Sequence, residues 1–440
     1  MSAPYYADES VTLWHGDALA LPLEDATVDL VVTSPPYFGL RSYQDGGEHY
    51  AGQIGSEATP AEFVDALIAA TREMVRVLKP SGSIWVNLGD KYSSRVALRP
   101  SSHQDGLQPG RPGVEKDWKA SKARGEARMP YQNVTDRETG QFIPEKSLMG
   151  IPARYMIRCI DELGLILRAE VIWSKPNGLP ESVTDRVRRS HETWFHFTKE
   201  PRYYSAVDEI REAHEPGTHQ RRLDGQPTPK QAAGLANGTR RGYMPETYTN
   251  PLGKLPGSVW TIATQPLTVP ASLGVDHFAA FPMEWPRRII TGWSPREVCT
   301  ACGEGRRPVV ASEGATQRSM LAESGGNARY EGAGGQGLDF AGSHNVWRTH
   351  AITGYACDCP DTAAPTTPGV VLDPFSGTGT TALMAKVLGR RAVGVDLSAD
   401  YCRLAQWRVN DPGQIASAMQ VDKVAPPMDD QGVLDLGESA

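Results

Sequence analysis

The sequence predicts an α/β fold built on a mostly parallel sheet with helices on both of its faces. Short apolar strands alternate with amphipathic helices, one glycine-rich loop joins a strand to a helix, and a proline-rich loop follows another strand. The chain has 440 residues, of which 40% are hydrophobic and 22% charged, so it can bury a large core. This composition excludes disordered, collagenous and small disulfide-stabilised proteins.

The predicted elements are spread over the chain. We expect strands where short β-branched apolar runs end at turn residues, and helices where apolar side chains recur every three to four residues. Residues 11–37 have the pattern strand, loop, strand. The predicted strands include residues 28–32, 83–88, 169–173, 370–372 and 392–395, and the predicted helices are residues 60–79, 151–163 and 382–388.

Other segments divide this predicted core. The core itself falls in residues 1–90, 147–204, 259–295 and 366–410. Residues 91–146 are polar, with eleven basic and seven acidic residues, and residues 205–258 are polar and irregular. Residues 296–365 are rich in glycine, and residues 411–440 hold six acids against one base, so we expect a disordered acidic tail. The tail carries −5 of the net charge of −7, which leaves a nearly neutral body that can still hold a basic cleft.

The glycine-rich loop, residues 373–381, reads Asp-Pro-Phe-Ser-Gly-Thr-Gly-Thr-Thr. Its glycines let backbone N–H groups approach a ligand, and the helix that it opens adds positive potential. Asp396 ends the next strand, 19 residues after Gly377, where nucleoside-binding folds place a carboxylate on ribose hydroxyls. This loop matches neither the dinucleotide fingerprint nor the phosphate-loop signature. The loop therefore indicates an adenosine-containing ligand without a polyphosphate.

The proline-rich loop reads Thr-Ser-Pro-Pro-Tyr over residues 33–37. Two prolines hold their carbonyl groups in fixed directions without an N–H to compete, and a tyrosine offers a flat face for stacking. The Ser34 hydroxyl and the Pro35 carbonyl can accept the protons of an exocyclic amino group while Tyr37 stacks on the base. An ordinary turn after a strand is the alternative interpretation.

Together, S-P-P-Y and D-P-F-S-G-T-G-T-T resemble the paired motifs of the S-adenosylmethionine-dependent amino-methyltransferases of DNA. The order of the two motifs is that of the family's β class. Further segments resemble the same family: residues 15–18, 76–83, 173–177, 191–192 and 277–290. The resemblance covers about residues 11–90, 147–204 and 255–410, but not the segment 92–146, the segment 296–365 or the tail.

The resemblance implies a Rossmann-like methyltransferase core, with a target-recognition region at residues 205–258. The polar composition of residues 91–146 predicts a flexible basic insertion, either a solvated loop or a lid that clasps DNA. The substrate would be double-stranded DNA, whose target base leaves the duplex and displaces the sulfonium methyl directly. The methionyl part of the cofactor would lie on the backbone around Phe375 and Gly377. Asp373 would meet its amino group directly or through water, and Asp396 would hold the ribose. The implied catalytic residues are Ser34, Pro35, Pro36 and Tyr37, and the implied cofactor contacts are Asp17, Phe281, Asp373, Pro374, Phe375, Ser376, Gly377, Gly379, Thr380 and Asp396.

The base that is methylated is indicated by Ser34. Within the family that the chain resembles, serine before Pro-Pro-Tyr usually accompanies methylation of cytosine at N4, whereas aspartate or asparagine usually accompanies methylation of adenine at N6. Cytosine is therefore favoured, with adenine as the alternative. Methylation of RNA or of a protein glutamine is a further alternative, although N-P-P-Y is usual for glutamine. A zinc-containing DNA-binding protein with an inactive core is the alternative without enzymatic activity.

Four of the six cysteines form two close pairs, C-x-x-C at Cys299 and Cys302 and C-x-C at Cys357 and Cys359. In a cytosolic chain this pattern favours a metal site over disulfides. We expect four thiolates around a structural zinc ion that ties off the insertion, with unrelated reduced cysteines as the alternative.

The sequence shows no apolar run near 20 residues and no basic, apolar start typical of a secretory signal. We therefore expect a cytoplasmic protein without a membrane partner, associated with the nucleoid of a bacterial or phage-infected cell. Restriction–modification is an expected context, with a cognate restriction enzyme as functional partner. The sequence leaves the oligomeric state open, and it does not give the recognition sequence.

Overall fold

The computed structural model describes residues 3–39, 53–93, 143–144, 146–178, 180–213, 252–274, 280–313 and 349–421. It also describes four short strands, which are β4 (Gln44–Asp45), β5 (Glu48–His49), β7 (Val96–Ala97) and β8 (Tyr131–Gln132). Most of the predicted insertion at 91–146, most of the region 205–258 and the tail from residue 422 lie outside the described residues.

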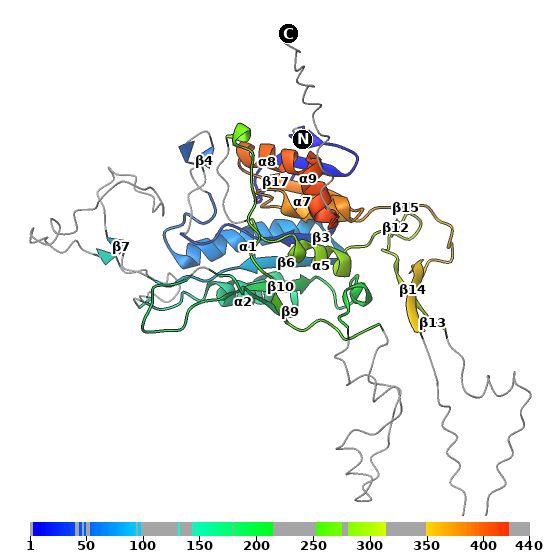
Figure 1. The fold of residues 1–440 in the computed structure, drawn as a ribbon, viewed down its shortest axis with the longest axis horizontal. Coiled ribbons are helices and arrows are strands. Elements are labelled where there is room, and N and C mark those ends of the chain that lie inside the picture. Colours follow the sequence, from blue (N-terminus) through cyan, green and yellow to red (C-terminus); the bar gives the residue numbers. More distant parts are fainter. Residues whose placement is uncertain are drawn as a thin grey trace, which may run out of the picture.

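A nine-stranded sheet forms the centre of the part that is described (Figure 1). Its strands β2, β17, β16, β3 and β6 run parallel to one another, as predicted, while β1 is antiparallel to β2 and β10 is antiparallel to both β6 and β9. In spatial order the strands are β1 (Tyr6–Ala7), β2 (Val11–His15), β17 (Arg391–Asp396), β16 (Val370–Asp373), β3 (Val28–Thr33), β6 (Leu78–Leu88), β10 (His191–Thr198), β9 (Ile166–Ser174) and β11 (Val259–Thr261).

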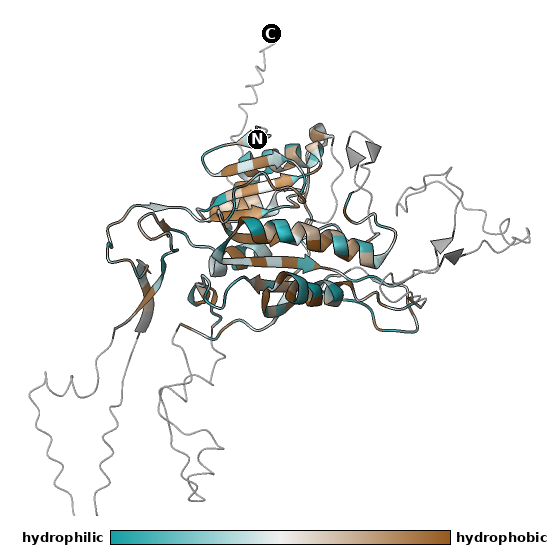
Figure 2. Cartoon of the chain, turned by 180° about the vertical axis from the view of Figure 1, so that it is seen from behind, coloured by the Kyte–Doolittle hydropathy of each residue, from teal (hydrophilic) through white to brown (hydrophobic). Residues whose placement is uncertain are grey.

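Helices cover both faces of this sheet, as the sequence predicts. The alternating side chains of β3 show the two faces, since Val31 joins one buried cluster and its neighbours Leu30 and Val32 join the other. Helices α1 (Pro60–Val77) and α2 (Ile151–Leu163) contribute to the first cluster, and α5 (Glu284–Trp293), α7 (Thr380–Val387), α8 (Ala399–Asn410) and α9 (Pro412–Met419) to the second. Figure 2 shows hydrophilic and hydrophobic residues alternating along α1, as expected for a helix with one buried face.

The structure differs from the sequence expectation at three places. Helix α1 ends at Val77 and β6 begins at Leu78, so residues 78 and 79, which were expected at the end of the helix, belong to the strand. Strand β10 follows β9 without a helical crossover, so it has to return antiparallel within the otherwise parallel core. The tail was expected to be disordered from residue 411, but α9 lies at its start. Asp411 caps this helix by accepting a hydrogen bond of 2.8 Å from the N–H of Gln414, Pro412 occupies its first turn, and Ala418 is fully buried.

Smaller strand pairs lie outside the main sheet. Strand β12 (Val298–Cys299) pairs with β15 (Thr366–Thr367), and β13 (Arg307–Glu313) pairs with β14 (Thr349–Ala356) in an arm that points away from the main sheet (Figure 1). Two short 3-10 helices, η1 (Val207–Ile210) and η2 (Ala271–Leu273), complete the assignment. Among the described helices, none is long and apolar enough to cross a membrane.

Candidate active site

A pocket lies at the edge of the sheet where β3, β16 and β17 end. Because these strands are parallel neighbours, the loops that follow them meet at their carboxyl ends. The pocket encloses about 1020 Å³ of empty space, open solvent at its mouth included. Its walls are Asp17, Ala18, Leu19, Ser34, Pro36, Gln53, Ile54, Ala280, Phe281, Pro374, Phe375, Ser376, Gly377, Thr378, Thr380, Asp396, Leu397, Ser398 and Tyr401.

Ten of the fourteen predicted catalytic and cofactor-binding residues line this pocket. They are Asp17, Ser34, Pro36, Phe281, Pro374, Phe375, Ser376, Gly377, Thr380 and Asp396. The other four, Pro35, Tyr37, Asp373 and Gly379, lie outside the lining. Both predicted motifs therefore contribute to one pocket, although they are more than 300 residues apart in the sequence.

Asp396 fixes the glycine-rich loop from the neighbouring strand. One carboxylate oxygen accepts a hydrogen bond of 2.7 Å from the N–H of Gly377, and the other accepts one of 2.9 Å from the N–H of Ser398. Gly377 has φ +50°, in the left-handed region that favours glycine. A carboxylate oxygen has more than one lone pair, so Asp396 can still accept hydrogen bonds from a ligand in the pocket.

Asp373 lies behind the pocket wall with its side chain fully buried. One oxygen accepts hydrogen bonds from the hydroxyl of Thr33, over 2.6 Å, and from the N–H of Phe375, over 3.1 Å. The other accepts one of 2.8 Å from the hydroxyl of Thr381. Burial raises the pKa of the Asp373 carboxyl to about 6. In this arrangement the carboxylate shapes the loop from within, whereas the sequence suggested a contact with the cofactor.

Arg408, on α8, also holds the glycine-rich loop, and no sequence pattern predicted this role. Its guanidinium is buried and donates hydrogen bonds to the hydroxyls of Thr378, over 2.9 Å, and Thr380, over 2.8 Å. Burial lowers the pKa of this guanidinium to about 10. Gly379 lies against the same helix, because a Cβ there would be 2.8 Å from the Cβ of Ala405.

The loop after β3 is held by polar residues at the ends of β6 and β10. The hydroxyl of Tyr37 lies 2.6 Å from Oδ1 of Asn87 and 2.8 Å from Oε2 of Glu192, and the Ser34 hydroxyl lies 3.3 Å from the same Asn87 oxygen. Lys175 forms an ion pair with Glu192. Burial, with the neighbouring Glu192 carboxylate, raises the pKa of Tyr37 well above its ordinary value. Tyr37 is therefore a neutral phenol fixed at its hydroxyl.

The ring of Tyr37 is fixed as well. A Cβ at Gly89 would lie 2.7 Å from Cε2 of the Tyr37 ring, so only glycine at this position lets the ring pack there. The sequence suggested a stacking role for Tyr37, but it did not single out Asn87 and Glu192 as its partners. A sequence signal for Asn87 and Glu192 did exist, because both are polar residues at the ends of otherwise apolar strands.

Phe281 connects the pocket to a cluster of tryptophans. Its ring meets Trp194 edge to face, with the centroids 5.8 Å apart, and Trp194 stacks on Trp285 at 4.9 Å. Trp285 stacks in turn on Trp260 at 4.9 Å. A ligand in contact with Phe281 would thus be separated from the buried indole of Trp194 only by the Phe281 ring.

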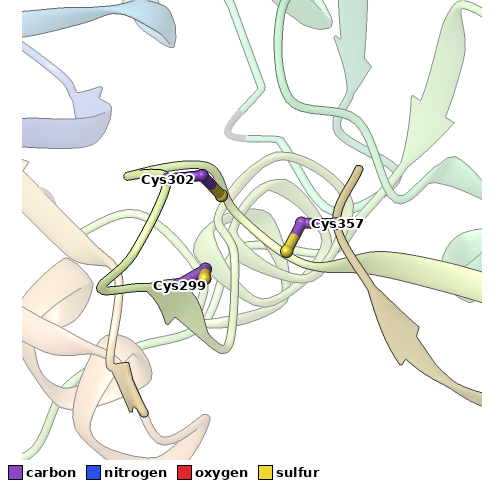
Figure 3. Close-up of side chains that lie close together, drawn as sticks. All are labelled: Cys299, Cys302 and Cys357. Carbon is purple, nitrogen blue, oxygen red and sulfur yellow. The ribbon is translucent and has the colours of Figure 1, made fainter. Parts of the chain in front are cut away.

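Three of the four paired cysteines come together outside this pocket. The sulfur atoms of Cys299, Cys302 and Cys357 all lie within 4.8 Å of one another (Figure 3). Cys359, two residues beyond Cys357, is half-buried and is not part of this group. The structure thus brings together three members of the predicted quartet.

The comparisons agree with the class that the fold and the pocket define, a methyltransferase with a Rossmann-like core. A family model described as DNA methylase, for N6 and N4 methylation, matches residues 28–298 and 364–407. The match covers well over half of the chain, so the chain belongs to this DNA methylase family. The resemblance inferred from the two motifs is confirmed, and the matched ranges leave out most of the insertion between the cysteine pairs.

Curated relatives are Type II methyltransferases. M.Cfr9I of Citrobacter freundii is 37% identical over 208 residues, which are 47% of this chain and 60% of that protein. M.XycI of Xanthomonas campestris pv. cyanopsidis is 29% identical over 413 residues, 93% of this chain and 90% of that protein. Among solved structures, PvuII DNA methyltransferase (cytosine-N4-specific) has a TM-score of 0.48 and 16% identity, and the match covers 95% of this chain and 94% of that chain.

Proposed function

We propose that this protein transfers a methyl group from S-adenosylmethionine to the amino group of a base flipped out of double-stranded DNA, and that the product is N4-methylcytosine. One observation carries the proposal. Ser34 and Pro36 line the same pocket as the glycine-rich loop and Asp396. A methyl donor held by the glycine-rich loop and an amino group held at Ser34 would meet in a single cavity, where proximity and orientation lower the barrier.

The lining of the pocket fits the proposed cofactor. The carboxylates of Asp17 and Asp396 can accept hydrogen bonds from ribose hydroxyls, and Phe281 and Ile54 offer apolar contacts to a purine. The first turn of α7, at Thr380, presents backbone N–H groups to a carboxylate. When bound, S-adenosylmethionine supplies a methyl carbon already activated by its sulfonium, so the amino nitrogen can displace the sulfur without a covalent enzyme intermediate.

The residues of the loop after β3 would orient the amino group. The Ser34 hydroxyl donates toward Asn87, which leaves its oxygen lone pairs free to accept an amino proton of the base. Pro35 presents a carbonyl without a competing N–H. Tyr37, fixed by Asn87 and Glu192, would keep this loop in one conformation, so that the nitrogen points at the methyl carbon.

Cytosine is the proposed base because serine stands before Pro-Pro-Tyr. Methylation of adenine at N6 is the alternative with the same pocket and mechanism. Methylation of RNA is a further alternative. Methylation of protein glutamine is disfavoured by Ser34, and an inactive core is disfavoured because both motifs line one intact pocket. We also propose that the protein acts in the cytoplasm and protects DNA from a cognate restriction enzyme, as the names of its Type II relatives suggest.

The test is mass spectrometry of nucleosides from the DNA of cells that express the protein. We compare the wild type with Ser34→Ala and with Ser417→Ala, a control on α9 outside the pocket lining. N4-methylcytosine in the wild type and the control, and its loss in Ser34→Ala, would support the proposal. N6-methyladenine instead would establish the adenine alternative. Neither base in DNA, from a protein that still binds S-adenosylmethionine, would exclude DNA as the substrate.

A further inference from the structure

The arm formed by β13 and β14 lacks a hydrophobic core in the described residues. Its two strands pair from Arg307 opposite Ala356 to Glu313 opposite Thr349. None of the side chains described in these strands is buried, and Val309 is 43% exposed. An isolated two-stranded hairpin is only marginally stable in water. The arm therefore needs a stabilising element other than apolar packing.

The base of the arm has the form of a thiolate-binding turn. Backbone N–H groups of Ala301 and Cys302 form hydrogen bonds with the sulfur of Cys299, and the N–H of Glu304 forms one with the sulfur of Cys302. The turn closes where the N–H of Gly303 donates to the Cys299 carbonyl over 2.8 Å, with Gly303 at φ +74°. Backbone N–H groups of one turn are thus directed at two of the sulfur atoms.

Cys357 supplies the third sulfur atom, from the end of β14 at the base of the arm. It directly follows Ala356, which pairs with Arg307, so it reaches the turn across the base of the hairpin (Figure 3). Around a tetrahedral zinc ion with Zn–S bonds of about 2.3 Å, sulfur atoms lie about 3.8 Å apart. The three sulfur atoms, within 4.8 Å of one another, are thus close to this spacing. Three sulfur atoms in one group fit a metal better than a disulfide, which would use only two.

We propose that Cys299, Cys302, Cys357 and Cys359 bind one structural Zn²⁺ that clamps the base of the β13–β14 arm. Cys359 is assigned as the fourth ligand because it lies two residues after Cys357, on the half-buried end of the same segment. Four thiolates around zinc form a closed structural site. This zinc site takes no part in methyl transfer, and the inference does not depend on the proposed function.

The clamp would also fix the arm relative to the core. Next to the cysteines, the Tyr204 hydroxyl donates to the Arg306 carbonyl over 3.2 Å, and Arg307 donates to the Tyr203 carbonyl over 3.2 Å. A Cβ at Gly305 would lie 2.6 Å from the Cβ of Pro295, so the turn packs closely on the core. The start of the arm is thereby held against core residues that follow β10 and α5.

The experiment measures zinc by mass spectrometry in the full-length protein, purified without chelators. We expect about one zinc ion per chain, and Cys302→Ser and Cys357→Ser to lower the content about tenfold or more. Cys402→Ser is the matched control, because Cys402 is buried on α8 away from the group and should retain zinc. Cobalt in place of zinc should give the absorption of a tetrahedral thiolate site in the wild type.

Contrary outcomes are well defined. Wild-type protein without zinc, or with full zinc content in Cys357→Ser, would overturn the proposal, as would a disulfide between two of these cysteines in freshly purified protein. Full zinc content in Cys359→Ser would overturn the assignment of the fourth ligand. Where a variant is insoluble, removal of zinc from the wild type by a chelator should increase proteolysis of the arm while binding of S-adenosylmethionine is retained. Unchanged proteolysis would contradict the clamp. None of these measurements depends on methylation activity.

Discussion

The hydroxyl of Thr33 donates a hydrogen bond of 2.6 Å to the buried carboxylate of Asp373. Thr33 is the last residue of β3 and precedes Ser34, while Asp373 is the last residue of β16 and opens the glycine-rich loop. The two loops that share the pocket are therefore joined at their roots by one hydrogen bond between side chains. A substitution at Thr33 or at Asp373 should therefore alter the conformation of both loops.

The first prediction concerns the pH dependence of stability through Asp373. Its carboxyl has a pKa of about 6 in the folded protein, above the ordinary value of 3.8, so folding favours the protonated form. This group should lower the free energy of unfolding as the pH rises from about 4 to about 6, by up to about 3 kcal/mol. Asp373→Asn cannot ionise and should lack this dependence. Urea unfolding of both proteins between pH 4 and 7 measures it, and parallel profiles would contradict the prediction.

The second prediction concerns Glu192 as a positioning residue for Tyr37. Glu192→Gln loses the ion pair with Lys175 and the carboxylate acceptor for the phenol. We expect kcat to fall about tenfold or more because a displaced loop misorients the base, with little change in the Kd for S-adenosylmethionine, since neither residue lines the pocket. Glu162→Gln, which breaks a more exposed ion pair on α2, should keep kcat. An equal loss in both variants would point to a general effect on stability.

The third prediction uses the contact between Phe281 and Trp194. Binding of S-adenosylmethionine should change the tryptophan fluorescence of the wild type, because a ligand against Phe281 lies next to the buried indoles. Phe281→Ala should weaken binding about tenfold through lost apolar contact. Fluorescence titration combined with calorimetry separates the signal from the affinity. Unchanged affinity in Phe281→Ala would remove this residue from the cofactor site.

The fourth prediction concerns the buried Arg408. Arg408→Ala removes the donors to the hydroxyls of Thr378 and Thr380 and leaves a cavity beneath the glycine-rich loop. We expect the free energy of unfolding to fall by about 2–4 kcal/mol and binding of S-adenosylmethionine to weaken. Arg403→Ala on the same helix, at a side chain that is 46% exposed, should cost less than about 1 kcal/mol. Chemical unfolding of both variants tests the difference.

Much of the core could be predicted from local patterns. Apolar runs, proline stops and glycine at the loop predicted the parallel strands, because these signals act over a few residues. The ten predicted residues that line the pocket came from the two motifs and from the resemblance to the methyltransferase family, which alone implied Asp17 and Phe281. Gln53 and Ile54 had no such signal, since they enter the pocket from a loop without a motif. The burial of Asp373 could not be predicted either, because its partner Thr33 is 340 residues away.

The expectation of a disordered tail from residue 411 was wrong because charges were counted over the whole segment. The acidic count of residues 411–440 predicted disorder, and it obscured the cap at Asp411 and the apolar side of the short helix that follows. The same limit applies to β10. Its apolar pattern fits a buried strand of either direction, and only the absence of a crossover helix from β9 makes it antiparallel.

The adjacency of β3 and β16 also constrains how the protein can be made. Every residue of β3 is buried in the finished sheet, where β16 covers one of its edges. The ribosome completes Asp373 340 residues after Thr33, on the order of 20–70 s later at the usual speed of synthesis. Throughout that interval the nascent chain carries an apolar strand with an uncovered edge, which is open to pairing with other chains. We therefore expect β3 to be most prone to pairing with other chains before β16 has been synthesised.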